Sequence, residues 1–223
     1  MGVNDVLIVG EPVAYGTGFI ALLLVLLSRY LSNYPITLAH EGGHMLALFV
    51  TLRGNLGWTM DDNADGATRP RRGGLWLFTL AVFFVGYAAP PLLGLAAAAL
   101  IAVGNPFAVL MIAIVLSVLA VARSRNGLAF LVPALIVVGF GWALIGGSVA
   151  VQAALAVGLA WLLLLGGLVD AVRLLQAPSS DGAQLARRTL IPNVVWSLAW
   201  VFLAVTTLIV GGQLLLRPGY TIG

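Results

Sequence analysis

The chain has no cysteine, no lysine and few charged residues of either sign. Without cysteine, disulfide bonds and thiolate metal ligands are excluded. Charged residues account for only 9% of the 223 positions, whereas soluble domains carry roughly 25%, so a soluble globular protein is excluded too. All eleven basic residues are arginines. They are spread along the chain, which fits membrane orientation better than a nucleic-acid-binding patch, so we expect no nucleic-acid partner.

Apolar residues dominate what is present and make up 61% of the chain. An α-helix needs about 20 of them to cross a bilayer, which leaves room for about six or seven spans and for no further soluble domain of ordinary size. The sequence therefore predicts one all-α polytopic membrane domain over residues 1–223, with a turn at residues 32–35 between its first two spans. The seven expected spans cover residues 17–31, 36–52, 75–103, 107–121, 128–145, 149–175 and 192–216.

The arginines predict how these spans are oriented. With seven spans, two arginines fall near one face of the membrane and nine fall on the other, and by the positive-inside rule the face with nine is cytoplasmic. We therefore expect a multi-pass protein of a cell membrane, most simply the cytoplasmic membrane of a bacterium, with its N-terminus in the cytoplasm and its C-terminus outside. The two are Arg29 and Arg217, and the nine are Arg53, Arg69, Arg71, Arg72, Arg123, Arg125, Arg173, Arg187 and Arg188.

The only two histidines, His40 and His44, lie four residues apart, and Glu41 follows the first of them. On a helix this spacing places both imidazoles on one face, one turn apart. Polar side chains are costly in an apolar stretch unless they are paired, so chance is a poor explanation of this H-E-x-x-H pattern. Two such imidazoles can bind one zinc ion, and the glutamate can act as base on a water that the metal activates.

Gly42 and Gly43 fill the two middle positions of the motif. Each glycine costs a helix interior roughly 1 kcal/mol against alanine, so a reason for them is expected. Bare backbone lets a substrate or another segment lie close to the metal, or it lets two membrane helices pack closely. The sequence leaves both interpretations open.

A catalytic zinc ion usually has three protein ligands, so a third ligand is expected among the acidic residues. Asp170 and Asp181 are the two candidates that lie near later apolar spans. Asp170 is equally placed for an i,i+3 pair with Arg173, and Asp181 is equally placed to cap a helix N-terminus. The residues alone do not choose between the two.

An H-E-x-x-H motif in an early span, followed by Asp181-Gly182 before the last span, resembles the site-2 protease family of intramembrane zinc metallopeptidases. Residues 86–90, Gly-Tyr-Ala-Ala-Pro, and the run after Ser180 look most like its compact bacterial branch without a PDZ domain. The family's Asn-Pro before Asp-Gly is replaced here by two serines, and its Gly-Pro-x-x-Asn is missing from the third span.

The resemblance implies that His40, His44 and Asp181 bind Zn²⁺ and that Glu41 is the general base, with Asp170 as the second choice of ligand. It implies hydrolysis of peptide bonds in membrane-anchored protein substrates within the bilayer. It also suggests that a short strand at residues 56–60, in a possible β-hairpin after the second span, holds substrate by strand addition.

Two other functions fit the same residues. One is a catalytically inactive membrane protein that keeps a structural or regulatory metal site. The other is a metal or proton transporter with the His, Glu and Asp groups as a relay, but transporters of this kind typically contain internal repeats, and none is evident here. Substrate identity, regulation and oligomeric state are not predicted.

Overall fold

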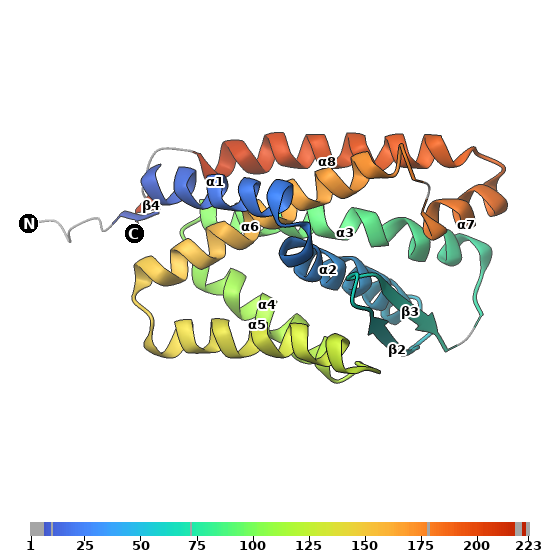
Figure 1. Ribbon diagram of the computed structural model, residues 1–223, viewed down its shortest axis with the longest axis horizontal. Coiled ribbons are helices and arrows are strands. Elements are labelled where there is room, and N and C mark those ends of the chain that lie inside the picture. Colours follow the sequence, from blue (N-terminus) through green and yellow to red (C-terminus); the bar gives the residue numbers. More distant parts are fainter. Residues whose placement is uncertain (1–6, 10, 72, 178, 217–219, 222–223) are drawn as a thin grey trace, which may run out of the picture.

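The structure is a computed structural model that describes residues 7–9, 11–71, 73–177, 179–216 and 220–221. In these residues it is mostly helical, with one short hairpin after the second helix, which confirms that part of the predicted fold (Figure 1). The helices are α1 (Glu11–Leu27), α2 (Arg29–Val50), α3 (Trp76–Ala102), α4 (Pro106–Val121), α5 (Gly127–Gly146), α6 (Val149–Arg173), α7 (Ser180–Thr189) and α8 (Asn193–Leu215). The strands are β1 (Leu7–Val9), β2 (Asn55–Met60), β3 (Gly66–Pro70) and β4 (Tyr220–Thr221).

Fewer helices than predicted satisfy the requirements of a complete membrane span. Within the described residues, α3, α5, α6 and α8 are long and apolar enough, and α1 with α2 qualifies as a fifth span, bent by 94°. Helix α4 has 16 residues, which gives a length of about 24 Å, short of the ~30 Å hydrocarbon core. The expected six or seven spans are therefore not confirmed, and four to five is the count that length and apolarity support.

The break between the first two helices lies earlier than predicted. The turn expected at residues 32–35 is helical, and Pro35 lies inside α2. The helices instead part at Ser28, which precedes Arg29 with a non-helical backbone. Pro35 is the seventh residue of α2, so the helix continues past it despite the backbone hydrogen bond that a proline removes.

Helices α3, α6 and α8 pack side by side along the long axis of the molecule, and α2 packs against α3 (Figure 1). Small residues allow these helices to approach closely. A side chain at Gly94 would collide with Leu164 of α6, and one at Gly166 would collide with Ile36 of α2. Membrane helices associate by such close packing because lipid offers no hydrophobic driving force between them.

The two ends of the described chain lie together. Strand β1 pairs antiparallel with β4, with Leu7 opposite Thr221, at the left end in Figure 1. The predicted placement of the N- and C-termini on opposite faces is therefore not confirmed. In Figure 1, α1 and α2 follow one another from the end with the paired termini toward the end with the β2–β3 hairpin. The prediction had counted them as two complete crossings.

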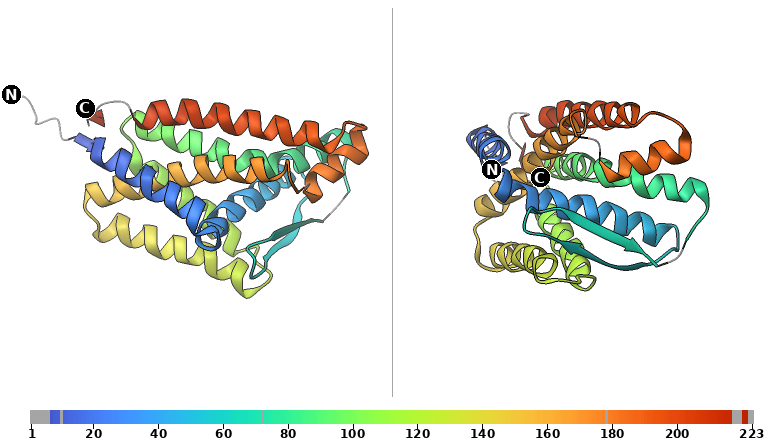
Figure 2. Two further views of the ribbon diagram at one scale, coloured as in Figure 1. Left: turned by 45° about the horizontal axis from the view of Figure 1, so that its top comes forward. Right: turned by 45° about the vertical axis from the view of Figure 1, so that its right-hand side comes forward.

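The opposite end of the molecule, here called the hairpin end, carries the β2–β3 hairpin, the α4–α5 connection and α7 (Figure 2). The backbone of Trp58 in β2 pairs with that of Ser124, and Trp76 at the start of α3 donates a hydrogen bond to the Arg188 carbonyl of α7. The merged α1–α2 pair, α3, the short α4, α5, α6 and α8 run alternately between the two ends of the molecule (Figure 1), so these segments all lie at the same end. The described arginines in these segments are Arg53, Arg69, Arg71, Arg123, Arg125, Arg173, Arg187 and Arg188; Arg72 and Arg217 lie outside the described residues.

Candidate metal centre

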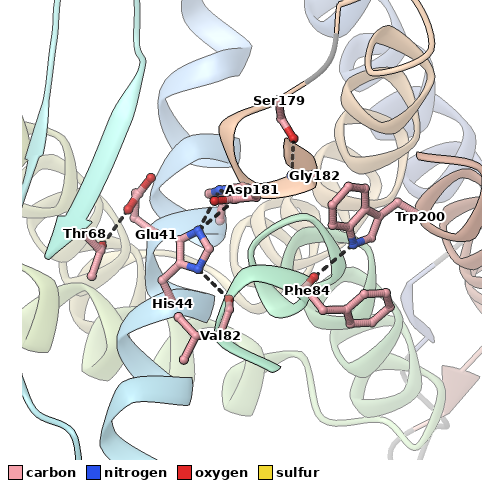
Figure 3. Close-up of polar contacts among 10 residues, drawn as sticks. Glu41, His44, Thr68, Val82, Phe84, Ser179, Asp181, Gly182 and Trp200 are labelled. Carbon is pink, nitrogen blue, oxygen red and sulfur yellow. Dashed lines mark hydrogen bonds and ion pairs between the residues drawn. The ribbon is translucent and has the colours of Figure 1, made fainter. Parts of the chain in front are cut away.

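Helix α2 presents its two histidines on one face, as their spacing predicts. The Nε2 atoms of His40 and His44 lie 3.0 Å apart, and the rings meet edge to face. The Nδ1 atom of His44 lies 2.8 Å from the carbonyl oxygen of Val82 in α3 (Figure 3). A carbonyl only accepts, so Nδ1 carries the proton and the Nε2 lone pair of His44 is available to a metal.

Asp181 reaches the histidines from α7, 137 residues away in the sequence from His44. Its Oδ2 atom lies 3.2 Å from Nε2 of both His40 and His44. The N-cap of α7 is Ser179, whose Oγ accepts a hydrogen bond from the Gly182 N–H at 3.0 Å. The alternative of Asp181 as N-cap is thus wrong: it lies within the first turn, where the positive end of the helix favours a carboxylate.

The glycine after Asp181 has a steric role. A Cβ atom at Gly182 would lie 1.8 Å from Oδ1 of Asn193, the first residue of α8. No side chain fits there, so the Asp-Gly pair allows α7 to start against α8 with the carboxylate of Asp181 facing α2.

Asp170 has the other role that its sequence position allowed. Its Oδ1 accepts a hydrogen bond from Nη1 of Arg173 at 2.8 Å, an i,i+3 ion pair at the end of α6. Asp170 lines the same cavity as Asp181 but contributes no atom to the convergent group. The structure therefore brings together His40, His44 and Asp181, and leaves Asp170 with Arg173.

The three side chains fit a zinc ion. Among the residues that the structure describes, they are the group whose possible ligand atoms all lie within 4.8 Å of one another. Tetrahedral ligands at zinc distances of 2.0–2.1 Å are separated by roughly 3.3 Å, and the donor atoms here are separated by 3.0 to 3.2 Å. Two imidazoles and one carboxylate are a ligand set that leaves a fourth position open, as catalytic zinc sites do.

The charge of Asp181 supports cation binding. Burial raises the pKa of its carboxyl group, but hydrogen bonding to His40 and His44 and their charges outweigh burial and hold this pKa below its ordinary value. The group is therefore ionised at neutral pH, which is the form that binds a metal.

Glu41 faces a different element from the two histidines. It is 3% exposed, and its Oε2 accepts a hydrogen bond from Oγ1 of Thr68 in β3 at 2.6 Å (Figure 3). A cavity of about 680 Å³ is lined by Glu41, both histidines, Asp181 and residues of β3. It is large enough for several residues of an extended peptide.

The two motif glycines have different surroundings. A Cβ atom at Gly43 would lie 2.6 Å from Cβ of Ala89 and 3.0 Å from the Val85 carbonyl oxygen in α3, whereas one at Gly42 would meet nothing within 4 Å. Close helix packing therefore explains Gly43. Open space beside Gly42 is compatible with the approach of a substrate.

Gly86 and Tyr87 of α3 shape the site. Both belong to the run 86–90 that carries part of the family resemblance, but the sequence did not predict their contact with the histidines. A Cβ atom at Gly86 would lie 2.6 Å from the His44 ring and 2.8 Å from the His40 ring. The next residue, Tyr87, meets the His40 ring edge to face with centroids 4.4 Å apart and rests against Trp200 of α8. Nothing in the spacing along α3 signals this contact, because it depends on the way α3 crosses α2.

The hairpin differs from the predicted edge strand. Trp58 of β2 is fully buried, its backbone exchanges hydrogen bonds with Arg123 and Arg125, and its indole N–H donates to the Ala120 carbonyl. The outer edge of β2 is therefore covered at Trp58. The strand that contacts the motif helix is β3, which the sequence reasoning left unassigned.

No curated protein and no solved structure matches the chain. The family described as Peptidase M50B-like matches residues 14–211, a range that includes α2, the hairpin, α3 and α7 with the whole convergent group. This match confirms the resemblance to site-2 proteases that the motifs indicated, and the chain belongs to the Peptidase M50B-like family.

Proposed function

We propose that the protein is a zinc-dependent intramembrane endopeptidase that hydrolyses peptide bonds of membrane-anchored protein substrates. The observation that carries the proposal is the meeting of His40, His44 and Asp181 from two distant helices, with Glu41 beside them in one cavity. Membership in a peptidase family supports the same reaction class.

Each residue has a distinct role in this proposal. The imidazoles of His40 and His44 and the carboxylate of Asp181 would hold the ion, which would supply Lewis-acid chemistry to the scissile carbonyl and the attacking water. The Glu41 carboxylate accepts a proton from that water as its oxygen attacks the carbonyl carbon. The same proton then passes from Glu41 to the leaving amide nitrogen as the C–N bond breaks.

Asp181 of the site comes from α7, which lies at the hairpin end with the arginine-bearing loops (Figure 1). By the positive-inside rule this end is cytoplasmic, so we infer that cleavage takes place within or near the cytoplasmic part of the substrate's span. The lipid bilayer and a membrane-anchored protein are then the expected partners.

The decisive experiment is Glu41→Gln in the full chain, reconstituted in vesicles with a set of single-span reporter proteins. We expect zinc content to stay at the wild-type level while cleavage falls by roughly 10²–10⁴-fold, the usual contribution of a general base. Asp170→Asn is the matched control, because it changes a carboxylate in the same cavity and should retain both zinc and activity.

Two outcomes would contradict the proposal. Cleavage at the wild-type rate by Glu41→Gln would remove Glu41 as base. Zinc binding by a wild-type protein that cleaves no reporter would favour the inactive protein with a retained metal site.

A further inference from the structure

We propose that Thr68 of β3 is a positioning residue for Glu41, so that the β2–β3 hairpin sets the orientation of the general base. This inference rests on the proposed function, because it concerns the same carboxylate. It adds a residue outside the motif helix to the catalytic arrangement.

The first step is the direct contact. The Thr68 hydroxyl donates to Oε2 of Glu41 at 2.6 Å, across 27 residues of sequence. An ionised carboxylate only accepts hydrogen bonds, and a bond to a charged group is shorter and stronger than one between neutral groups. Because Glu41 is 3% exposed, loss of this donor is poorly compensated by water.

The backbone of the same strand lies against the rest of the carboxylate. A Cβ atom at Gly66 would lie 2.5 Å from both Cγ and Oε1 of Glu41, so only a glycine permits this approach. Thr68 thus occupies one oxygen and Gly66 limits the space around the other. Together they restrict the Glu41 side chain to a narrow range of orientations.

The hairpin is itself fixed to the helices, so its contacts with Glu41 have a defined geometry. Thr37, one helical turn before Glu41, donates to the Ala64 carbonyl just before β3 at 2.7 Å. The Asn126 side chain at the start of α5 accepts from the Met60 N–H and donates to the Met60 carbonyl. The orientation of Glu41 therefore depends on a hairpin that is anchored to α2 through Ala64 and to α5 through Met60 of β2.

The test compares Thr68→Val, which keeps the shape and loses the donor, with Thr68→Ser, which keeps the donor. A hydrogen bond to a charged group contributes ~1.5–3 kcal/mol, so we expect Thr68→Val to lower kcat by roughly 10- to 100-fold. KM and the zinc dissociation constant should change by less than about threefold, and Thr68→Ser should retain most of kcat. Thr206→Val on the exposed face of α8, which also loses a hydroxyl hydrogen bond, is the matched control.

A second readout needs no catalysis. The carboxylate stretching band of Glu41, assigned by its absence in Glu41→Gln, should shift in Thr68→Val and stay in place in Thr68→Ser. In the Glu41→Gln background, Thr68→Val should have no additional effect on residual cleavage, since the two changes act on one contact.

The inference would be overturned by a Thr68→Val protein with wild-type kcat and an unshifted band, or by equal losses in the Val and Ser variants. Such results are distinguishable from failure of the proposed function. Failure of the proposed function would show as a fully active Glu41→Gln protein or as a wild-type protein that cleaves no reporter. Failure of this inference alone leaves the wild type and Thr68→Val active and Glu41→Gln inactive.

Discussion

At the scale of single residues, glycines shape the candidate metal centre as much as its proposed ligands do. Gly86 leaves the space into which both imidazoles project, and Gly182 leaves the space that Asn193 fills. Helix periodicity is enough to predict that His40 and His44 share a face. It says nothing about a glycine on another helix, because that requirement comes from the crossing of α2 and α3.

Gly86→Ala should therefore weaken metal binding although it replaces none of the proposed ligands. The added methyl group would lie 2.6 Å from the His44 ring and 2.8 Å from the His40 ring, so at least one ring must move. Changes next to metal ligands typically cost 10- to 100-fold in metal affinity, and we expect a loss of roughly that size in zinc-competition titrations. Gly139→Ala in α5 is the control, since nothing lies within 4 Å of its Cβ position; equal affinity in both variants would contradict the steric argument.

At the scale of secondary-structure elements, the motif helix is held by different neighbours on different faces. Its histidine face meets α3 and α7, while Glu41 meets β3. The sequence predicted the helix and the hairpin but placed the break between α1 and α2 too late, and it did not identify β3 as the strand that contacts Glu41. Local propensity marks Pro35 as a helix breaker and residues 56–60 as a β-forming run. It does not predict which distant segments these residues contact in the folded chain.

The two adjacent motif glycines should respond oppositely to the same change. Gly43→Ala places a methyl group 2.6 Å from Ala89 of α3, so we expect the thermal unfolding temperature to fall, with a cost of about 1–3 kcal/mol for overpacking. Gly42→Ala meets nothing within 4 Å and should be neutral or more stable by up to ~1 kcal/mol. Thermal unfolding in detergent measures both, and a stable Gly43→Ala protein would show that α2 and α3 do not pack this closely.

At the scale of the whole molecule, the arrangement separates a terminal end from the hairpin end. The pairing of β1 with β4 brings the two ends of the described chain together. The eight described arginines of the hairpin end lie in or beside the hairpin, the α4–α5 connection, the end of α6 and α7. The charge asymmetry could be predicted from the sequence. The number of crossings could not, because hydropathy does not show that α1 and α2 form one bent pair of helices.

This arrangement predicts that tags at the N- and C-termini face the same side of the membrane. Because the chain has no cysteine, single cysteines give an unambiguous label: Asn63→Cys in the hairpin turn and Gly146→Cys at the end of α5, where nothing lies within 4 Å of the Cβ position. A membrane-impermeant thiol reagent applied from one side should label only one of them. Both tags should be accessible from the side of Gly146, and tags on opposite sides would restore the seven-span topology.

The sequence by itself determined the membrane character, the helical class, the arginine asymmetry and the three motif residues, because composition and the helical repeat depend only on chain order. The residues alone did not choose between Asp170 and Asp181, and the family resemblance implied Asp181. Only the tertiary structure shows that Asp181 meets the histidines and that β3 contacts Glu41. Those outcomes depend on contacts between segments far apart along the chain, such as the 137 residues that separate His44 from Asp181. Local chemistry is nearly equal for the two aspartates, and the packing of α7 against α3 and α8 is what brings Asp181 to the histidines.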